Sequence, residues 1–215
     1  MNLSRAEFER RFAENRLRIA LVGMSNIGKS YTGMRLATAF DFELIEVDKL
    51  IWESLGQGSM ADFAAWQGQP YSDGYAEREA KSISLESDAT LKALSLPDGN
   101  AILDTTGSVI YTDKIVQEKL ASDWYIVHIE ATSDAVKRLK SQYFKHPKPL
   151  IWNNHYICGD KQTAKDAILD CYPKLLASRA RAYEKLANKT ITSDIILNPD
   201  VTIDEIYERL KPANK

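Results

Sequence analysis

Short segments rich in apolar residues alternate along the chain with longer segments in which apolar positions recur at helical spacing. The short segments have the length and composition of strands that are buried on both faces of a sheet. They are residues 17–22, 42–47, 101–104 and 124–130, with a fifth strand expected at 190–192 or at 195–197. Strands that alternate with helices in this way predict a parallel sheet inside a three-layer α/β/α fold.

The longer segments carry the signals of helices. Ser4–Glu7 and Thr202–Glu205 have the spacing of capping boxes, which predicts a helix at each of these two points. Helices are expected over 4–15, 31–40, 133–143 and 161–189, and in several pieces over 49–95. Pro173 predicts a break or a helix start within the last long segment. We interpret residues 1–215 as one domain with a leading helix in 1–16.

The link between the first strand and its helix fits the pattern G-x-x-x-x-G-K-[ST] of a phosphate-binding loop. Gly23 and Gly28 let the backbone wrap so that its amides converge on a phosphate chain. Lys29 would reach the β- and γ-phosphates, and the Ser30 hydroxyl would ligate Mg²⁺. A chance match in a glycine-containing turn is the alternative, and the order strand, loop, helix disfavours it. The predicted nucleotide-binding residues are Gly23, Met24, Ser25, Asn26, Ile27, Gly28, Lys29, Ser30 and Tyr31.

Two carboxylates follow the second strand, Glu46 and Asp48. Ligands of open parallel sheets bind beyond the carboxyl ends of the strands, so both acids are expected to face the phosphate loop. If the strand extends that far, two residues with this spacing point the same way. One could hold Mg²⁺ through water, and the other could accept a proton or a hydrogen bond from a substrate hydroxyl. The alternative is an ordinary strand end with Asp48 as a helix N-cap.

The third strand ends in Asp104. An apolar run that ends in aspartate after a phosphate loop has the Walker B form, in which the carboxylate orients Mg²⁺ or its water. A simple transition from strand to loop remains the alternative, because a lone apolar run with one acid is a weak signal.

Two intervals lie outside the sheet, residues 49–95 and residues 144–160. In small kinases the first interval carries the acceptor-binding lobe, and the second forms a lid that excludes water from the phosphate. Aromatic residues of the first interval that could line a pocket, or instead pack the helices together, are Trp52, Trp66 and Tyr75. Cationic candidates in the second are Lys145 and Lys148.

Charge and composition narrow the class of partner. The chain has 28 basic and 30 acidic residues, a formal net charge of −2, so no nucleic-acid partner is indicated. No segment approaches the roughly 18 apolar residues of a membrane span, and no apolar leader stands at the N-terminus. Cys158 and Cys171 are too few for a disulfide scaffold. We expect a cytoplasmic protein that binds neither nucleic acid nor membrane and is a monomer or a weak homodimer.

Along most of residues 17–210 these motifs resemble those of the shikimate kinase family, a branch of the nucleoside-monophosphate-kinase-like P-loop kinases. The segments that carry the resemblance are Gly23–Ser30, Glu46-Val47-Asp48, Gly58–Phe63, Lys148-Pro149-Leu150-Ile151 and the pair Arg179 and Tyr183. The resemblance implies a P-loop kinase fold with a five-stranded parallel sheet, a helical acceptor-binding lobe and a lid. It also implies ATP and Mg²⁺ as cofactors and a small-molecule hydroxyl as the phosphate acceptor.

The resemblance further implies roles for individual residues. The metal candidates are Ser30, Glu46 and Asp104, with Glu46 in the magnesium shell. The acceptor-binding candidates are Asp48, Gly107 and Arg179. The catalytic candidates are Lys29, Asp48 and Lys148, with Lys148 closing over the phosphates.

The chain departs from the family pattern at three points. Ala76 stands where the family's acceptor-binding arginine is expected, only Gly107 is left of a triple glycine, and Lys148 replaces a lid arginine. A lysine cannot make the planar two-point contact of a guanidinium. Loss of an arginine that forks onto a carboxylate removes a bond worth roughly 1.5–3 kcal/mol. The sequence therefore predicts phosphate donation and leaves the acceptor open.

We therefore expect an ATP-dependent phosphotransferase that acts on a hydroxyl of a small molecule. Two alternatives remain open. One is an ATP-binding regulator or degenerate kinase with little turnover, which the altered lid and glycine segment favour. The other is a nucleoside or nucleotide kinase.

Overall fold

The computed structural model describes residues 1–56, 60–145 and 150–213. Within these ranges five strands form one sheet with the order β2-β3-β1-β4-β5, and each neighbouring pair is parallel. The strands are β1 (Arg18–Val22), β2 (Glu43–Glu46), β3 (Ala101–Asp104), β4 (Tyr125–Glu130) and β5 (Lys189–Thr192). The predicted five-stranded parallel sheet is confirmed, with β1 at its centre.

Helices connect the strands and close the chain. They are α1 (Arg5–Ala13), α2 (Lys29–Phe40), α3 (Val47–Leu55), α4 (Met60–Gln67), α5 (Tyr75–Leu94), α6 (Lys114–Asp123), α7 (Ser133–Lys145), α8 (Ala164–Leu186), α9 (Ser193–Leu197) and α10 (Ile203–Leu210), with a short 3₁₀ turn η1 (Val109–Tyr111). In the described part of the chain no helix is long and apolar enough to cross a membrane.

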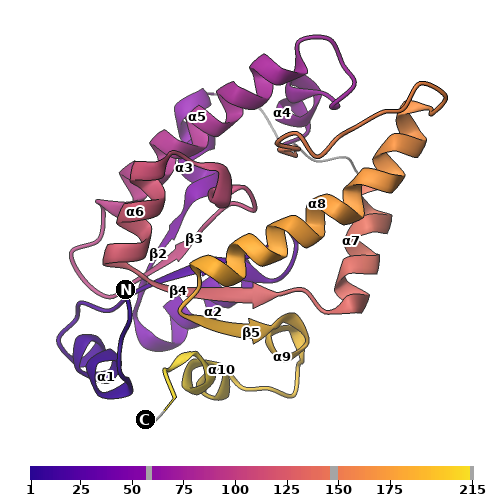
Figure 1. Ribbon diagram of the computed structural model, residues 1–215. Helices are drawn as coiled ribbons and strands as arrows, with labels where there is room; N and C mark the ends of the chain where they lie inside the picture. The colour runs from indigo at the N-terminus through magenta and orange to yellow at the C-terminus, as the bar shows by residue number, and fades with distance from the viewer. Residues whose placement is uncertain (57–59, 146–149, 214–215) are drawn as a thin grey trace.

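Alternating strand residues feed two separate apolar cores, one on each face of the sheet. In β1, Ala20 and Val22 belong to the first core, and Ile19 and Leu21 belong to the second. Helices α3, α5, α6, α7 and α8 contribute side chains to the first core, and α1, α2, α9 and α10 contribute side chains to the second. Figure 1 shows how these helices are arranged around the sheet. A sheet buried on both faces needs near-continuous apolar strands, which explains the sequence pattern.

The structure decides between the two alternatives for the last strand and contradicts the break predicted at Pro173. Residues 195–197, one of the two candidates for the last strand, lie in α9, and β5 contains the other candidate, 190–192. Pro173 lies inside α8 and does not end it. The residue is exposed, and buried side chains on both sides of it, Tyr172 and Leu175 among them, hold the helix against the core. Packing therefore outweighs the one backbone hydrogen bond that proline removes.

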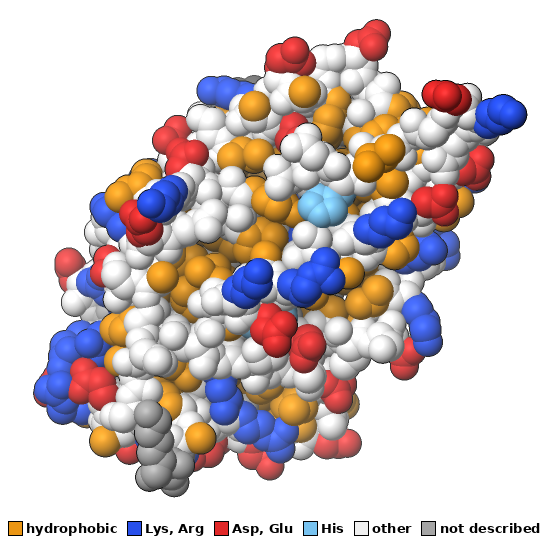
Figure 2. Space-filling view, in the orientation of Figure 1, with side chains coloured by type: hydrophobic (Ala, Val, Ile, Leu, Met, Phe, Trp, Pro, Cys, Tyr) orange, Lys and Arg blue, Asp and Glu red, His pale blue; other side chains and the backbone are white. Residues whose placement is uncertain are grey.

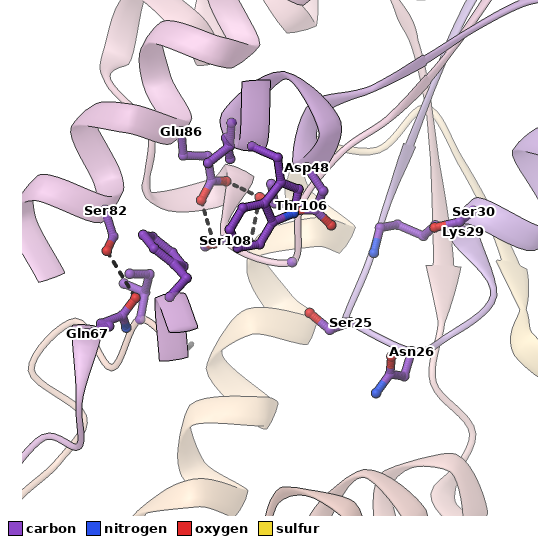
Figure 3. Close-up of a pocket in the computed structure, with 15 residues that line it drawn as sticks. Ser25, Asn26, Lys29, Ser30, Asp48, Gln67, Ser82, Glu86, Thr106 and Ser108 are labelled. Carbon is purple, nitrogen blue, oxygen red and sulfur yellow. Dashed lines mark hydrogen bonds between the residues drawn. The ribbon is translucent and has the colours of Figure 1, made fainter. Parts of the chain in front are cut away.

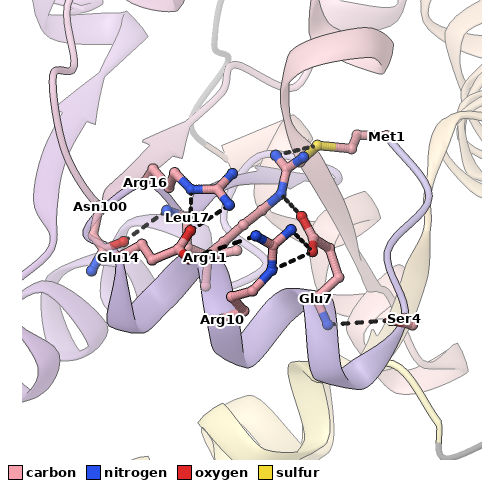
Figure 4. A network of polar contacts seen from close by, with 9 residues as sticks. All are labelled: Met1, Ser4, Glu7, Arg10, Arg11, Glu14, Arg16, Leu17 and Asn100. Atoms are coloured by element: carbon pink, nitrogen blue, oxygen red, sulfur yellow. Dashed lines mark hydrogen bonds and ion pairs between the residues drawn. The ribbon is translucent and has the colours of Figure 1, made fainter.

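The leading helix α1 is fixed to the sheet by one buried asparagine. Ser4 caps α1 by accepting from the amide of Glu7 at 3.2 Å, as the capping pattern predicts (Figure 4). Asn100, just before β3, donates to the carbonyl of Phe12 at 3.0 Å and accepts from the amide of Leu17 at 2.7 Å. These bonds join the end of α1 to the starts of β1 and β3, at the edge of the sheet remote from the phosphate loop.

The surface carries both signs of charge. On the face shown in Figure 2, acidic and basic side chains are intermixed. This distribution agrees with the net charge of −2.

Candidate active site

The phosphate loop connects the carboxyl end of β1 to the first turn of α2. Gly23 and Gly28 have φ angles of +148° and +107°, and Asn26 has a φ of +60°. A side chain on Gly23 would place its Cβ 2.7 Å from the carbonyl oxygen of Ile129, a contact that only glycine avoids. The loop therefore wraps against the end of β4 and presents the N-terminus of α2 to the edge of the sheet.

The nine predicted nucleotide-binding residues divide by where their side chains lie. Met24 and Ile27 are buried in the two cores, so only their backbone groups can meet a phosphate. Tyr31 is exposed on α2, with the Arg35 guanidinium 5.3 Å from its ring centre. The side chains of the other four line a cleft beside the loop; they are Ser25, Asn26, Lys29 and Ser30. The Lys29 ammonium is buried and donates to the carbonyl of Met24 at 3.1 Å.

The carboxylates after β2 do not share a strand face, contrary to the expectation for an extended strand. Strand β2 ends at Glu46, and Val47 begins α3, so Asp48 lies in the first turn of a helix. Glu46, not Asp48, occupies the N-cap position. An aspartate is favoured in the first turn of a helix because of the helix dipole. The turn carries Asp48 into the lining of the cleft, which Glu46 does not line, and both residues remain exposed.

Asp104 lies at the same edge, because the register pairs it with Glu46 on β2 and with Leu21 on β1. Burial raises the pKa of Asp104, and the charge of Lys29 together with a hydrogen bond from Ser30 opposes that rise. Its buried Oδ1 atom has no hydrogen-bond partner. A buried carboxylate oxygen without a partner is a site for a ligand proton, a water or a cation.

These groups fit Mg²⁺ bound together with a phosphate chain. In the described ranges, no cluster of three or more His, Cys, Asp or Glu side chains forms a metal site by itself. Mg²⁺ typically takes one or two carboxylates, and substrate phosphates and water complete its shell. The orphaned oxygen of Asp104 and the hydroxyl of Ser30 provide such a partial set.

The cleft extends from the phosphate loop to the helices that follow β2, with a volume of about 240 Å³. Its far wall comes from α3, α4 and α5. The lining residues on these helices are Asp48, Ile51, Trp52, Phe63, Gln67, Ser82 and Glu86. In the view of Figure 3, Asp48 lies between Lys29 on one side and Glu86 on the other. Trp52 thus lines a pocket, whereas Trp66 is largely exposed and stacks on Phe63 at a centroid distance of 5.3 Å.

Glu86 is a buried carboxylate at the far side of this cleft. The hydroxyl of Thr106 donates to its Oε1, and the hydroxyl of Ser108 donates to its Oε2 at 2.5 Å. Burial raises the pKa of Glu86 to about 7, and the nearby charge of Asp48 adds to the rise, against the effect of the two hydroxyls. An acid that titrates near neutral pH inside a cleft is a common property of functional sites.

The raised pKa of Glu86 predicts a loss of stability as the pH rises. An unfolded glutamate has a pKa near 4.5, whereas the folded one keeps its proton to about pH 7. Between these values the folded state binds more protons, so the free energy of unfolding falls as pH increases. Glu86→Gln cannot ionise, so its stability relative to the wild type should rise between pH 5 and pH 8 by on the order of 2–3 kcal/mol. Thermal or urea unfolding of the variant and the wild type at both pH values measures this difference in stability.

Asp88→Asn is the matched control for this substitution, because Asp88 is exposed on the same helix. Its effect on stability should be the same at both pH values. If Glu86→Gln also changes the free energy of unfolding by the same amount at pH 5 and pH 8, Glu86 is already ionised at pH 5 in the folded protein.

Position 76, where the family's acceptor-binding arginine is expected, does not line the cleft. Ala76 is exposed, and the positions of α5 that line the cleft are Ser82 and Glu86. Tyr75 and Glu79 face another segment. The Tyr75 hydroxyl lies 2.6 Å from the carbonyl of Leu150, and Glu79 accepts from the backbone amides of residues 152 and 153. Their spacing resembles the family motif, but they anchor residues 150–153, in the middle of the predicted lid.

The segment after β3 meets the phosphate loop at Gly107. A Cβ on Gly107 would lie 2.8 Å from the Ser25 hydroxyl and 3.1 Å from the Ser25 amide. Arg179, predicted to bind the acceptor, lies behind Gly107 and donates to its carbonyl at 3.0 Å and to that of Ile151 at 2.7 Å. Tyr183 also donates to the Gly107 carbonyl. Arg179 does not line the cleft that contains Asp48, but it lines an adjoining pocket together with Ser25 and Asn26, and its buried Nε atom has no hydrogen-bond partner.

Gly107→Ala should disturb the phosphate loop. The added methyl group has no space beside Ser25, and overpacking of this kind costs about 1–3 kcal/mol. We expect a lower free energy of unfolding and weaker binding of a fluorescent ATP analogue. Gly159→Ala is the control, because the only contact there is a side-chain oxygen at 4.0 Å. If both variants have the same stability and the same affinity for the analogue, the close approach at Gly107 contributes to neither.

Part of the predicted lid and of the resembling segments lies outside the described residues. Lys148 and Pro149, and Gly58 and Ser59 before α4, belong to these stretches.

A family model with the description "Shikimate kinase" matches residues 25–211. The chain belongs to the shikimate kinase family. Shikimate kinase 2 of Sodalis glossinidius is 23% identical over 194 residues, which is 90% of this chain and 95% of that protein. The shikimate kinase of Chloroherpeton thalassium is 27% identical over 193 residues, which is 90% of this chain and 91% of the relative. Membership supports a phosphotransferase of the shikimate kinase type.

Solved shikimate kinases share the fold. The enzyme of Acinetobacter baumannii, solved in complex with shikimate, has a TM-score of 0.60 and 22% identity, and the match covers 83% of this chain and 85% of that one. The enzyme of Bacteroides thetaiotaomicron has a TM-score of 0.62 and 19% identity, with 90% and 96% covered. The predicted family and the predicted P-loop kinase fold are both confirmed.

Sequence reasoning missed one prominent residue of the cleft, Glu86. A signal for it exists in the amphipathic pattern of α5. The buried side of this helix carries small and apolar residues such as Ser82, Ala89 and Ala93, and Glu86 falls on the same stripe. An acid on the buried stripe of a shikimate kinase helix calls for a hydrogen-bonding partner or a ligand.

Proposed function

We propose that this chain transfers the γ-phosphate of ATP to a hydroxyl group of a small molecule, with Mg²⁺ as the metal. The observation that supports the proposal most directly is the shared cleft. The phosphate loop forms one end, the helices between β2 and β3 form the other, and Asp48 lines the wall between them. A donor and an acceptor that lie in one cleft react as an oriented pair, which is the main source of catalysis in phosphoryl transfer.

The roles follow from the positions. The loop amides and Lys29 would neutralise the charge of the phosphates, and Asp104 and Ser30 would hold Mg²⁺, which supplies further neutralisation when it is bound. Asp48 would accept a hydrogen bond from the acceptor hydroxyl, orient it, and take its proton as the new P–O bond forms. Gly107 and Arg179 would fix the floor of the cleft against the phosphate loop.

An acceptor-dependent release of ADP tests the proposal. The full chain is incubated with ATP and Mg²⁺ and with a panel of cyclic polyols, sugars and nucleosides, and a coupled assay follows ADP. We expect release to rise at least tenfold over the rate without acceptor for one class of the panel. Tight ATP binding without any acceptor-dependent release would instead support the regulator or degenerate kinase. A preference for nucleosides would support a nucleoside kinase.

A further inference from the structure

Residues 150–153 belong to the predicted lid, yet they contribute to the wall of the cleft. The side chain of Ile151 lines the cleft, and only 3% of this residue is exposed. Trp152 beside it is buried as well. None of these four residues lies in a helix or a strand. Their backbone groups therefore need hydrogen-bond partners from elsewhere in the fold.

Three side chains of α4 and α5 hold the backbone of this segment, and we call Gln67, Tyr75 and Glu79 the clamp. Gln67 donates from Nε2 to the carbonyl of Leu150 at 2.7 Å. The Tyr75 hydroxyl lies 2.6 Å from the same carbonyl oxygen. Glu79 accepts from the backbone amides of residues 152–153. The bonds to Glu79 are charge-assisted, so they are stronger than bonds between neutral groups.

Arg179 holds the same segment from α8. Its Nη2 donates to the carbonyl of Ile151 at 2.7 Å, and its Nη1 donates to the carbonyl of Gly107 at 3.0 Å. The clamp and Arg179 together bond four successive backbone groups, the carbonyls of residues 150–151 and the amides of residues 152–153. Because each partner is a group of the chain itself, the fold alone determines where Ile151 enters the cleft.

Gln67 connects the clamp to the interior of the cleft. The residue is fully buried and lines the cleft. Its Oε1 accepts from the hydroxyl of Ser82, which also lines the cleft, at 3.0 Å (Figure 3). The two ends of the amide thus have different partners, and this fixes the plane of the group. A ligand that bonds to Ser82 or Gln67 would contact the same hydrogen-bond network that holds Leu150.

From these contacts we propose that the clamp residues are positioning residues, which hold residues 150–153 as a fixed wall at the acceptor end of the cleft. Ile151 is then in place before a nucleotide binds, and the wall does not depend on closure over ATP. The consequence for the acceptor rests on the proposed function. The clamp itself can be tested without any acceptor.

Amide hydrogen exchange of the full chain, followed by NMR, tests the clamp directly. The amide of Trp152 should be protected in the wild type, and ADP with Mg²⁺ should change its exchange rate by less than about threefold. Glu79→Ala should accelerate this exchange by about tenfold or more, because the amide loses its acceptor. Glu79→Gln should restore most of the protection, because its amide oxygen can still accept.

Glu77→Ala is the matched control, because Glu77 is exposed on the same helix and its removal changes the net charge equally. It should leave the exchange of Trp152 unchanged. The amides of residues 101–104 in β3 report global unfolding and should stay protected in every variant. Protection of Trp152 that arises only after ADP is added, or that persists in Glu79→Ala, would overturn the inference.

Kinetics test what the wall does for the acceptor. Glu79 does not line the cleft, so it can affect the acceptor only through residues 150–153. With the best acceptor of the panel, Glu79→Ala should raise the KM for the acceptor at least fivefold and leave the KM for ATP within twofold. Glu79→Gln should return the first value toward that of the wild type.

Equal values of the acceptor KM in Glu79→Ala and the wild type would overturn the positioning role. If no compound of the panel promotes ADP release by the wild type, the proposed function fails. The exchange of Trp152 still decides the clamp in that case, so the two failures can be told apart.

Discussion

Lys29→Ala is expected to lower kcat by about a hundredfold to a thousandfold, which is typical for the loss of one preorganised charge at a reacting centre. Lys29 is buried at the first turn of α2, and its ammonium is held within the phosphate loop by the carbonyl of Met24. No other basic side chain of the described residues lines the cleft. Steady-state kinetics with ATP, Mg²⁺ and the best acceptor of the panel measure the change.

The control for this substitution is Lys49→Ala. Lys49 is an exposed lysine on α3, so its removal changes the net charge equally without touching the cleft. Its kcat should remain within about twofold of the wild type. A Lys29→Ala variant with nearly wild-type turnover would contradict the assignment of the phosphate site.

Asp48→Asn should lower kcat by about a hundredfold or more, as expected for the loss of a general base. The amide keeps the size of the side chain but can neither accept the proton of the acceptor hydroxyl nor repel the charge of Glu86. Nucleotide affinity should remain within about threefold of the wild type, because Asp48 lies on α3 and not in the phosphate loop. Single-turnover measurements separate the chemical step from binding.

Glu53→Gln provides the comparison on the same helix, because Glu53 is exposed. Glu53→Gln should leave both kcat and the affinity for nucleotide unchanged. If Asp48→Asn weakens nucleotide binding and leaves kcat intact, Asp48 belongs to the donor side of the cleft and the proposed role is wrong.

Local patterns in the sequence predicted the strand β1, the loop after it and the helix α2. The phosphate loop is defined by residues adjacent in the chain, and the apolar strand before it can be recognised without tertiary information. The helix starts at Ser4 and Thr202 are equally local: Ser4 caps α1 with its side chain, and Thr202 with Glu205 forms a complete capping box. Family membership, inferred from these motifs, is confirmed by the match over residues 25–211.

The acceptor side depends on contacts that the sequence does not show. The sequence left open whether Asp48 continues the second strand or begins a helix, and the structure begins α3 at Val47, where the helix packs into the core beside α5. The Tyr75–Glu79 pair imitates a family motif two turns away from the cleft-lining part of α5. The role of Glu86 becomes visible only when Thr106 and Ser108, which follow β3, are brought beside it.

The tight packing around the phosphate loop separates what can vary in this cleft from what cannot. Backbone of β4 lies against Gly23, side chains of α9 lie 3.1–3.2 Å from the Cβ position of Gly28, and Gly107 closes the third side. These three positions have almost no space for a side chain. The opposite wall consists of side chain tips on helices that can be exchanged without moving the backbone. A lineage with this architecture can therefore acquire a new substrate by a few replacements on α3, α4 and α5 while its machinery for handling phosphate is inherited intact.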